Sequence, residues 1–198
     1  MTGVILAGGE NLRMSVPKAF LNIGGERLIE RNLSILKRVF EDTAIVTNKP
    51  ELYIYLGVPM FGDVYRIRGP MTGVFTALIN SHYPWVFVSA CDMPFLKEEL
   101  IMYMVDIAKT ADGFDAIVPL SGDTMEPLFA MYSKRLIKDM EGFLLKGGRS
   151  LCRFLEGERI HPLSEEDVKR FDPDGKSFVN LNTPEDFLRE IGGRICLV

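Results

Sequence analysis

A pair of glycines followed by two cations stands close to the N-terminus. Gly8 and Gly9 end the apolar run 3–7, and Arg13 and Lys18 follow on the same stretch. Glycines let backbone N–H groups approach a ligand without a side chain in the way, and the cations favour an anion, so the segment suits a polyphosphate. The patterns GxxxxGK[ST] and GxGxxG are absent, which excludes a Walker A loop and the dinucleotide fingerprint. An ordinary glycine-rich turn with solvated charges accounts for this stretch equally well.

A single carboxylate, Asp92, comes directly after the strongly apolar segment 85–90. A carboxylate at the end of a central strand can bind Mg²⁺ through one oxygen, because Mg²⁺ commonly takes one or two carboxylates together with substrate phosphate and water. The competing interpretation is an N-cap for the helix that follows Pro94. The adjacent Cys91 has no evident histidine partner, so we expect a small buried residue and not a nucleophile.

Three further polar residues follow or precede expected elements. Asp63 comes after a short apolar run at 58–61, and it is either a turn residue or part of a site. Asn180 and Asn182 flank the entry to the last expected helix. Their amide oxygens could add to a metal site, although asparagine is equally typical of turns and caps.

The two histidines, His82 and His161, are isolated in the sequence and are expected to be surface or structural residues. Ser15 does not lie in a G-x-S-x-G motif. These observations weaken serine hydrolase, cysteine hydrolase and zinc hydrolase interpretations.

The elements that must position these residues alternate between strands and helices. Short apolar or β-branched runs predict strands, and apolar residues at helical spacing predict helices. The expected strands are 3–7, 43–47, 58–61, 85–90, 115–118, 126–132 and 159–163, with an extended stretch at 178–181. The expected helices are 27–40, 72–81, 97–109, 133–145, 150–155 and 164–170, and a last one that starts at Thr183-Pro184 and ends at Gly192-Gly193.

This alternation predicts an α/β protein, in which a mostly parallel sheet is covered by helices on both faces. Ligands of such open sheets bind at the carboxyl ends of the strands, which is where the polar residues above occur. The chain carries no internal repeat or linker, so we expect one Rossmann-like, three-layer domain over residues 1–198.

Composition narrows the function classes. The 198 residues include 47% hydrophobic and 25% charged residues, with a formal charge of -4. A mildly acidic chain without a basic block is a poor candidate for binding nucleic acid through its phosphates. Three scattered cysteines argue against a disulfide framework or a zinc site. The N-terminus resembles neither a signal peptide nor a membrane span, so we expect a cytoplasmic protein without a membrane partner.

Taken together, the motifs resemble the molybdenum cofactor guanylyltransferase (MobA) family of nucleotidyltransferases, from Gly3 to about Ile191. The segments that carry the resemblance occur in the family's order. They are Gly3-Val4-Ile5-Leu6-Ala7-Gly8-Gly9 with Arg13-Met14 and Lys18-Ala19, then Asp63 and Gly69-Pro70-Met71-Thr72-Gly73, then Cys91-Asp92-Met93-Pro94-Phe95-Leu96, then Glu126-Pro127-Leu128-Phe129-Ala130, and last Asn180-Leu181-Asn182-Thr183-Pro184-Glu185-Asp186.

The resemblance implies roles for these residues. Asp92 would bind Mg²⁺, with Asn182 completing the metal site, and Arg13 and Lys18 would hold the triphosphate and act in catalysis with Asp92. The remaining nucleotide-binding residues implied by the resemblance are Leu6, Ala7, Gly8, Gly9, Asn48, Asp63 and Gly73. The first half of the chain, residues 1–110, would bind the nucleotide, and residues 111–198 would bind the acceptor.

Three positions depart from the family pattern. Thr47 stands where the family has an asparagine, and Asn48 comes next. Ser15 replaces a glycine, and Pro17 replaces an aspartate and restricts Val16 to extended conformations. Arg13 and Lys18 are retained, so the departures concern the path of the phosphate loop and not the type of reaction.

The reaction implied by the resemblance is GMP transfer from GTP to molybdenum-bearing molybdopterin, with pyrophosphate released. Gly8-Gly9 favours GTP, because the cytidylyl branch has alanine at the first of these glycines. Proteins that deliver the cofactor are possible partners. The alternatives are transfer of cytidylyl or another nucleotidyl group to a different phosphorylated acceptor, and a non-catalytic GTP-binding module. An NAD-dependent dehydrogenase is a remoter alternative.

Overall fold

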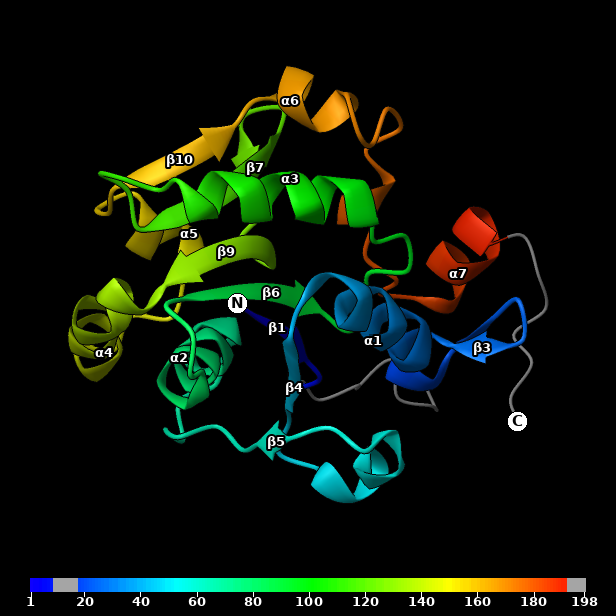
Figure 1. The fold of residues 1–198 in the computed structure, drawn as a ribbon. Coiled ribbons are helices and arrows are strands. Elements are labelled where there is room, and N and C mark those ends of the chain that lie inside the picture. The colour runs from blue at the N-terminus through cyan, green and yellow to red at the C-terminus, as the bar shows by residue number, and fades with distance from the viewer. Residues whose placement is uncertain (9–17, 192–198) are drawn as a thin grey trace.

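The computed structural model describes residues 1–8 and 18–191, and its centre is one twisted sheet (Figure 1). The strands lie in the order β10-β7-β9-β6-β1-β4-β5, and β8 pairs with β7. Their bounds are β1 Thr2–Leu6, β4 Asp42–Val46, β5 Met60–Phe61, β6 Trp85–Ala90, β7 Ala116–Ser121, β8 Thr124–Met125, β9 Phe129–Ser133 and β10 Ile160–Leu163. A separate hairpin joins β2, Asn22–Ile23, to β3, Glu26–Arg27.

Most neighbouring strands of the sheet are parallel, as the alternation of elements predicts. β1 pairs in parallel with β4 and β6, β4 with β5, and β7 with β10. The exception is β9, which lies antiparallel between β6 and β7. Every residue of the central strands β1 and β6 is buried, because helices cover both faces of the sheet there.

Helices cover the two faces in separate groups. The core on one face packs Ile5 and Phe87 against residues of α1, Leu28–Val39, and α3, Glu98–Lys109, and includes Val168 of α6, Glu165–Lys169. The core on the other face packs Val4 and Val88 against residues of α2, Pro70–Asn80, α4, Ile137–Leu145, and α5, Leu151–Leu155. The predicted three-layer α/β/α arrangement is therefore confirmed.

A third, smaller core lies at one end of the sheet. Leu21, Ile23 and Leu28 pack there against Leu181 and Phe187, where Phe187 belongs to α7, Pro184–Ile191. Figure 1 shows α7 beside the β2–β3 hairpin. This small core joins two segments that lie near opposite ends of the sequence.

Some predicted boundaries are wrong. The expected strand 126–132 begins only at Phe129, because the Phe129 N–H donates to the Glu126 carbonyl and closes a turn. The expected helix 133–145 starts as a 3-10 turn, Lys134–Leu136. The expected extended stretch 178–181 is wrong at its start, since Lys176–Phe178 is another 3-10 turn. The hairpin of β2 and β3 was not expected, and Gly24 and Gly25 form its turn with φ of 65° and 94°.

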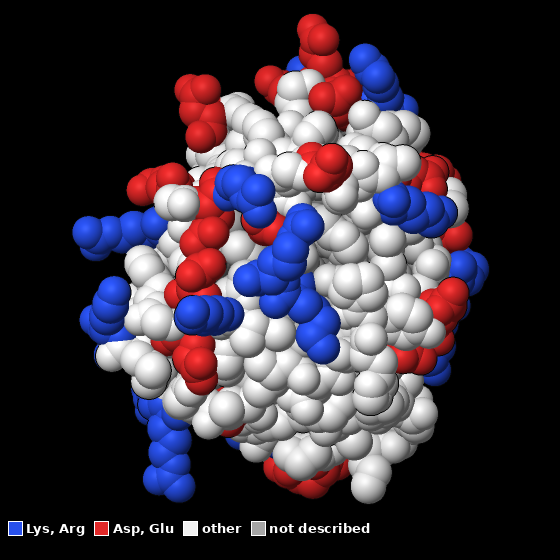
Figure 2. All heavy atoms as spheres, turned by 60° about the vertical axis from the view of Figure 1, so that its left-hand side comes forward, with Lys and Arg blue, Asp and Glu red and all other residues white. Residues whose placement is uncertain are grey.

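Charges on the surface are mixed. Figure 2 shows acidic and basic side chains interspersed on the face that it presents, without a uniform basic area. None of the helices in the described ranges has the length and apolar character that crossing a membrane requires.

Candidate functional site

The candidate residues lie at one edge of the sheet, where the parallel strands end. Ala7 follows β1, Asn48 and Asp63 come shortly after β4 and β5, and Asp92 comes shortly after β6. The backbone ladder continues past the strands, because the Ala7 N–H donates to the Val46 carbonyl at 2.9 Å and the Cys91 N–H donates to the Leu6 carbonyl at 3.1 Å. The residues that directly follow these strands, Ala7, Thr47 and Cys91, are therefore neighbours in space.

Three predicted residues meet in one cluster. The Lys18 ammonium donates to Oδ2 of Asp92 at 2.9 Å and to Oδ1 of Asn182 at 2.6 Å. The side chains of Lys18 and Asp92 are each 18% exposed, so the pair is partly shielded from water. Lys18 and Asn182 are 164 residues apart. The small core of Leu21 and Leu181 brings their two segments together.

The alternative interpretation of Asp92 as an N-cap is wrong. α3 begins at Glu98 and its N-cap residue is Lys97, five residues beyond Asp92. The loop between them is anchored by the buried side chain of Met93, and the Met93 carbonyl accepts a hydrogen bond from the buried Asn32 amide at 3.0 Å. The Asp92 carboxylate has no capping task and faces the Lys18 ammonium.

Asn182 is likewise free of a capping role. Thr183 caps α7 through its hydroxyl, which accepts the Asp186 N–H at 3.1 Å. The Asp186 carboxylate accepts the backbone N–H groups of Asn182 and Thr183, each at 3.0 Å. These hydrogen bonds lower the pKa of Asp186 below its usual value, and the bond from the Asn182 N–H has the largest effect. The Asn182 backbone is thus fixed while its side-chain oxygen faces the cluster. Asn180 instead donates to the Phe178 carbonyl, as a turn residue does.

A second pair lies at the ends of β4 and β5. The Asn48 amide donates to the Asp63 carboxylate at 2.7 Å, and the Asp63 N–H donates back to Oδ1 of Asn48 at 2.9 Å. Thr47 is buried, and its hydroxyl accepts the Lys49 N–H. Asn48, and not Thr47, therefore presents the exposed amide at this edge.

Two glycines occupy contrasting surroundings. A Cβ at Gly73 of α2 would lie 3.2 Å from Cδ1 of Leu6, so glycine allows α2 to approach the end of β1 closely. A Cβ at Gly8 would meet no atom of residues 1–8 or 18–191 within 4 Å, so none of the described side chains fills the space beside its backbone. Gly9 and Arg13, and the departures Ser15 and Pro17, lie outside the described residues.

The structure also shows the surroundings of Cys91, which is half-buried, and of the two histidines. Burial raises the pKa of the Cys91 thiol to about 12, and the neighbouring Asp92 adds to this, so the thiol stays protonated near neutral pH. His82 is exposed, and the His161 ring packs against Phe114 at 5.0 Å between centroids.

The oxygens of Asp92 and Asn182 suit a hard divalent cation. One carboxylate and one amide oxygen converge on the same point, because both contact the single Lys18 ammonium. Oxygen ligands of this kind bind Mg²⁺, Mn²⁺ or Ca²⁺ in preference to softer metals. Within residues 1–8 and 18–191, no three His, Cys, Asp or Glu side chains gather that could hold a metal by themselves. This pair of oxygens thus fits an ion that takes its other ligands from substrate and water.

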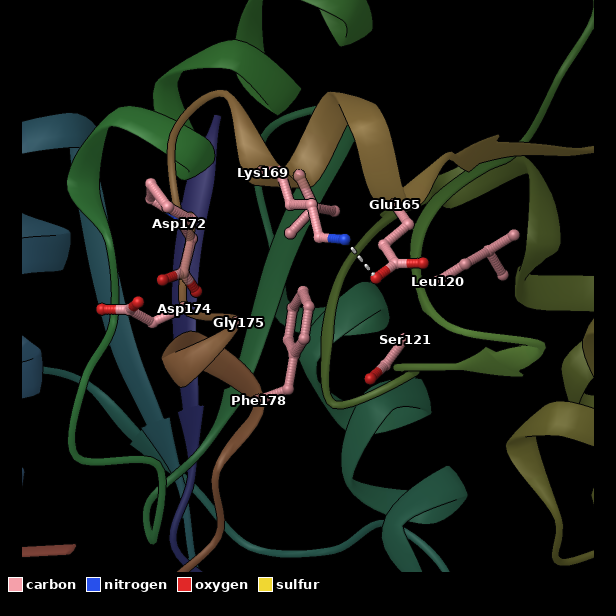
Figure 3. Close-up of a pocket in the computed structure, with 10 residues that line it drawn as sticks. Leu120, Ser121, Glu165, Lys169, Asp172, Asp174, Gly175 and Phe178 are labelled. Carbon is pink, nitrogen blue, oxygen red and sulfur yellow. Dashed lines mark ion pairs between the residues drawn. The ribbon is translucent and has the colours of Figure 1, made fainter.

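A hollow of about 220 Å³ lies at the carboxyl end of β7 (Figure 3). Leu120, Val168 and Phe178 form apolar parts of its wall, and the Lys169–Glu165 ion pair, 2.7 Å long, lies beside it. β7 runs parallel to β6, because both are antiparallel to β9, so the hollow opens at the same edge of the sheet as Asp92.

Comparison with known families matches residues 3–162 to the MobA-like NTP transferase domain. The chain belongs to this family and is an enzyme of the nucleotidyltransferase class, whose members generally use a divalent metal.

Individual relatives agree with this assignment. The chain is 36% identical over 188 residues to a probable molybdenum cofactor guanylyltransferase of Pelotomaculum thermopropionicum, covering 95% of this chain and 90% of the relative. It is also 36% identical to a molybdenum cofactor guanylyltransferase of Syntrophotalea carbinolica, covering 94% and 88%. Among solved structures, molybdopterin-guanine dinucleotide biosynthesis protein A of Archaeoglobus fulgidus matches with a TM-score of 0.84 and 29% identity, over 97% of both chains.

Proposed function

We propose that this protein transfers GMP from GTP to molybdenum-bearing molybdopterin, which yields molybdopterin guanine dinucleotide and pyrophosphate. The observation that carries the proposal is the cluster of Lys18, Asp92 and Asn182 at the carboxyl edge of the sheet. The names of the relatives supply the nucleotide and the acceptor.

The chemistry needs no covalent intermediate on the protein. A terminal phosphate oxygen of the acceptor attacks the α-phosphorus of GTP, the bond from that phosphorus to the bridging oxygen breaks, and pyrophosphate leaves with the electron pair. Both reactants are anions, so the protein contributes positioning and positive charge.

Mg²⁺ is the metal we assign to Asp92 and Asn182, and when bound it would neutralise charge between the attacking and transferred phosphates. The two oxygens are occupied by the Lys18 ammonium in the structure. Lys18 would therefore leave them when the substrate complex forms, and its ammonium would turn to the phosphates of the nucleotide together with Arg13.

The nucleotide would lie across the ends of β1, β4 and β5. Leu6, Ala7, Gly8 and Gly9 would contact base and ribose, with Gly73 beside Leu6. Asn48 and Asp63 would contact the nucleotide from the neighbouring strands. The open side of Gly8 gives a purine room close to the backbone.

The acceptor would bind to the half formed by residues 111–198. The hollow at the end of β7 belongs to this half and opens at the edge that carries Asp92. Strands lie about 4.8 Å apart and one strand separates β7 from β6, so the hollow is offset from Asp92 by about 10 Å across the sheet. The cytoplasmic location and the delivery proteins expected from the sequence remain predictions.

Titration calorimetry with GTP, CTP, UTP and ATP, each with and without Mg²⁺, tests the proposal. We expect selective binding of GTP that Mg²⁺ strengthens, followed by pyrophosphate release once molybdopterin is added. Asp92→Asn should lose the Mg²⁺ dependence, whereas the exposed control Asp112→Asn should retain it. Preference for CTP would overturn the guanylyl assignment, and GTP binding without pyrophosphate release would indicate a non-catalytic module.

A further inference from the structure

Two loops that are distant in sequence carry the metal-binding oxygens. One runs from Asp92 to the start of α3, and the other, residues 177–182, precedes α7. They meet at the Asp92 carbonyl, which accepts the Leu181 N–H at 2.9 Å. The distance between the Asp92 carboxylate and the Asn182 amide therefore depends on what fixes these loops to each other.

Ser177 is the side chain that joins them. It is fully buried, and its hydroxyl donates to the Phe95 carbonyl at 3.3 Å and accepts the Lys97 N–H at 3.2 Å. One hydroxyl thus satisfies two backbone groups in the loop that follows Asp92. Without it, both groups would lack a partner in a part-buried turn, and the turn would rearrange to reach water.

Asp172 holds Ser177 in place. Asp172 is fully buried and accepts the Ser177 N–H at Oδ2, at a distance of 2.7 Å. Its own backbone is fixed by a turn through Pro173 and Asp174, in which the Gly175 N–H donates to the Asp172 carbonyl at 3.0 Å. Oδ1 of Asp172 has no hydrogen-bond partner among the described residues. The hydrogen bond from the Ser177 N–H to Oδ2 is therefore the one that the structure gives this carboxylate within those residues.

We propose that Ser177, oriented by Asp172, is a positioning residue of the transfer reaction, and that it sets the separation of the Asp92 and Asn182 oxygens. The inference depends on the proposed function, because it takes these oxygens to be the metal ligands. Ser177 touches neither oxygen and acts only through the two loops. Losing a group that hydrogen-bonds a metal ligand directly typically weakens metal affinity or activity by about 10–100-fold, and since Ser177 bonds to the loop and not to the ligand, we expect the lower end of that range.

A purely structural role for Ser177 would affect stability alone, and Ser89 provides the matched control. Ser89 is also fully buried and lies in β6, the strand that leads to Asp92. Its hydroxyl has no partner among the described residues, so Ser89→Ala removes a buried hydroxyl without disturbing a loop.

The test measures Mn²⁺ binding by electron paramagnetic resonance, with and without GTP, in the wild type, Ser177→Ala and Ser89→Ala. Hydrogen exchange of the Lys97 and Leu181 amides is followed in the same proteins. We expect Ser177→Ala to bind Mn²⁺ about 10-fold more weakly and to lose protection at both amides, while Ser89→Ala matches the wild type. Unchanged Mn²⁺ affinity and protection in Ser177→Ala, or an equal loss in Ser89→Ala, would overturn the positioning role.

Asp172→Asn is the second variant, and it covers the case in which Ser177→Ala does not fold. It keeps the side-chain size and weakens the acceptor of the Ser177 N–H. We expect weaker Mn²⁺ binding in the same direction and, if Ser177→Ala folds, no additional loss in the double variant, because the two residues act as one unit. Wild-type affinity in Asp172→Asn, or full additivity in the double variant, would contradict the proposal.

Mn²⁺ binding by the wild type distinguishes failure of the proposed function from failure of the positioning role of Ser177. If the wild type binds no Mn²⁺ with or without GTP, the proposed function fails, and the positioning role fails with it. If the wild type binds Mn²⁺ and Ser177→Ala binds it equally well, only the positioning role fails.

Discussion

Two carboxylates with cationic partners lie at opposite edges of the same sheet, and their surroundings differ. Asp92, at the carboxyl edge, faces one flexible lysine and one neutral amide. Asp115, just before β7 at the other edge, is 7% exposed and binds two arginines. Arg159 donates to it from Nε at 3.0 Å and from Nη2 at 2.7 Å, and Arg135 donates from Nε. The Asp115 backbone also bonds to Arg159 and Ser133.

This difference separates an exchangeable carboxylate from a structural one. The two arginines occupy both oxygens of Asp115 with three hydrogen bonds, which leaves little room for a ligand. A single lysine on a flexible stem is a point charge that can leave Asp92 at small cost. An acidic residue with a cationic partner is therefore a site candidate only when the partner can be exchanged.

The largest expected effect is on catalysis at Asp92. Asp92→Ala should lower kcat by about 10²–10³-fold, as the loss of one electrostatic stabiliser does. Its melting temperature should stay close to that of the wild type, because the lost ion pair is single and partly exposed. Steady-state pyrophosphate release and thermal unfolding measure both quantities. Near-normal turnover would remove Asp92 from the reaction.

The converse result is expected at Asp115. Asp115→Ala leaves the two arginines without their shared acceptor and should lower the free energy of unfolding by about 2–3 kcal/mol. For a chain of this size, that corresponds to a fall in melting temperature of roughly 5–10 °C. Turnover per folded molecule should be unchanged at a temperature where the variant is fully folded. A variant as stable as the wild type would contradict the structural role of this cluster.

Replacing Lys18 tests whether the lysine and the metal compete. Without nucleotide, Lys18→Met should bind Mn²⁺ about 30-fold more tightly, because the repulsion between one unit charge and a divalent ion at about 4 Å is about 2 kcal/mol even at the dielectric constant of water. Its affinity for GTP should fall, because a phosphate contact is lost. Lys97→Met is the control, since it removes the same charge from the N-cap residue of α3, five positions beyond Asp92, whose side chain makes no capping hydrogen bond. An equal gain in Mn²⁺ affinity in both variants would indicate that the change in net charge, and not competition between Lys18 and the metal, causes the gain.

The smallest effect is expected for an exposed pair. Lys109 and Asp106 of α3 are 2.8 Å apart, with side chains 61% and 71% exposed. Lys109→Ala should change the free energy of unfolding by no more than about 0.5 kcal/mol and leave turnover unaffected. Chemical denaturation measures this change. If Lys109→Ala lowered the free energy of unfolding as much as Asp115→Ala does, an exposed ion pair would stabilise this protein as strongly as a buried one, and burial would not explain the difference between them.

The sequence predicts the fold where apolar runs are long. Segment 85–90 is predicted to the residue, because a short apolar run rich in aromatic and β-branched residues is typical of a buried strand. The strands β2, β3 and β8 are two residues each, too short for any periodicity to reveal them. The antiparallel insertion of β9 between β6 and β7 depends on tertiary packing and has no local signal.

The site is predicted only in its motif residues. Asp92, Asn182 and Lys18 stand in recognisable segments, but their meeting depends on the small core of Leu21 and Leu181, which packing alone creates. Ser177 and Asn32 were missed because neither belongs to a motif. Asn32 did carry a signal, since helical spacing places it on the apolar face of α1 between Ile29 and Leu36, where a polar residue needs a partner. Ser177 carried a weaker one, the Asp172-Pro173-Asp174-Gly175 turn signature that comes just before it.

The order of elements along the chain has a consequence for synthesis. Every strand of the described sheet is complete at Leu163, whereas Asn182 follows nineteen positions later, beyond α6. A chain synthesised at about 5–20 residues per second therefore contains every residue of these strands about one to several seconds before Asn182 is added. Chains released prematurely in this interval would carry Asp92 but lack Asn182, and so would lack one of the two oxygens that we propose as metal ligands.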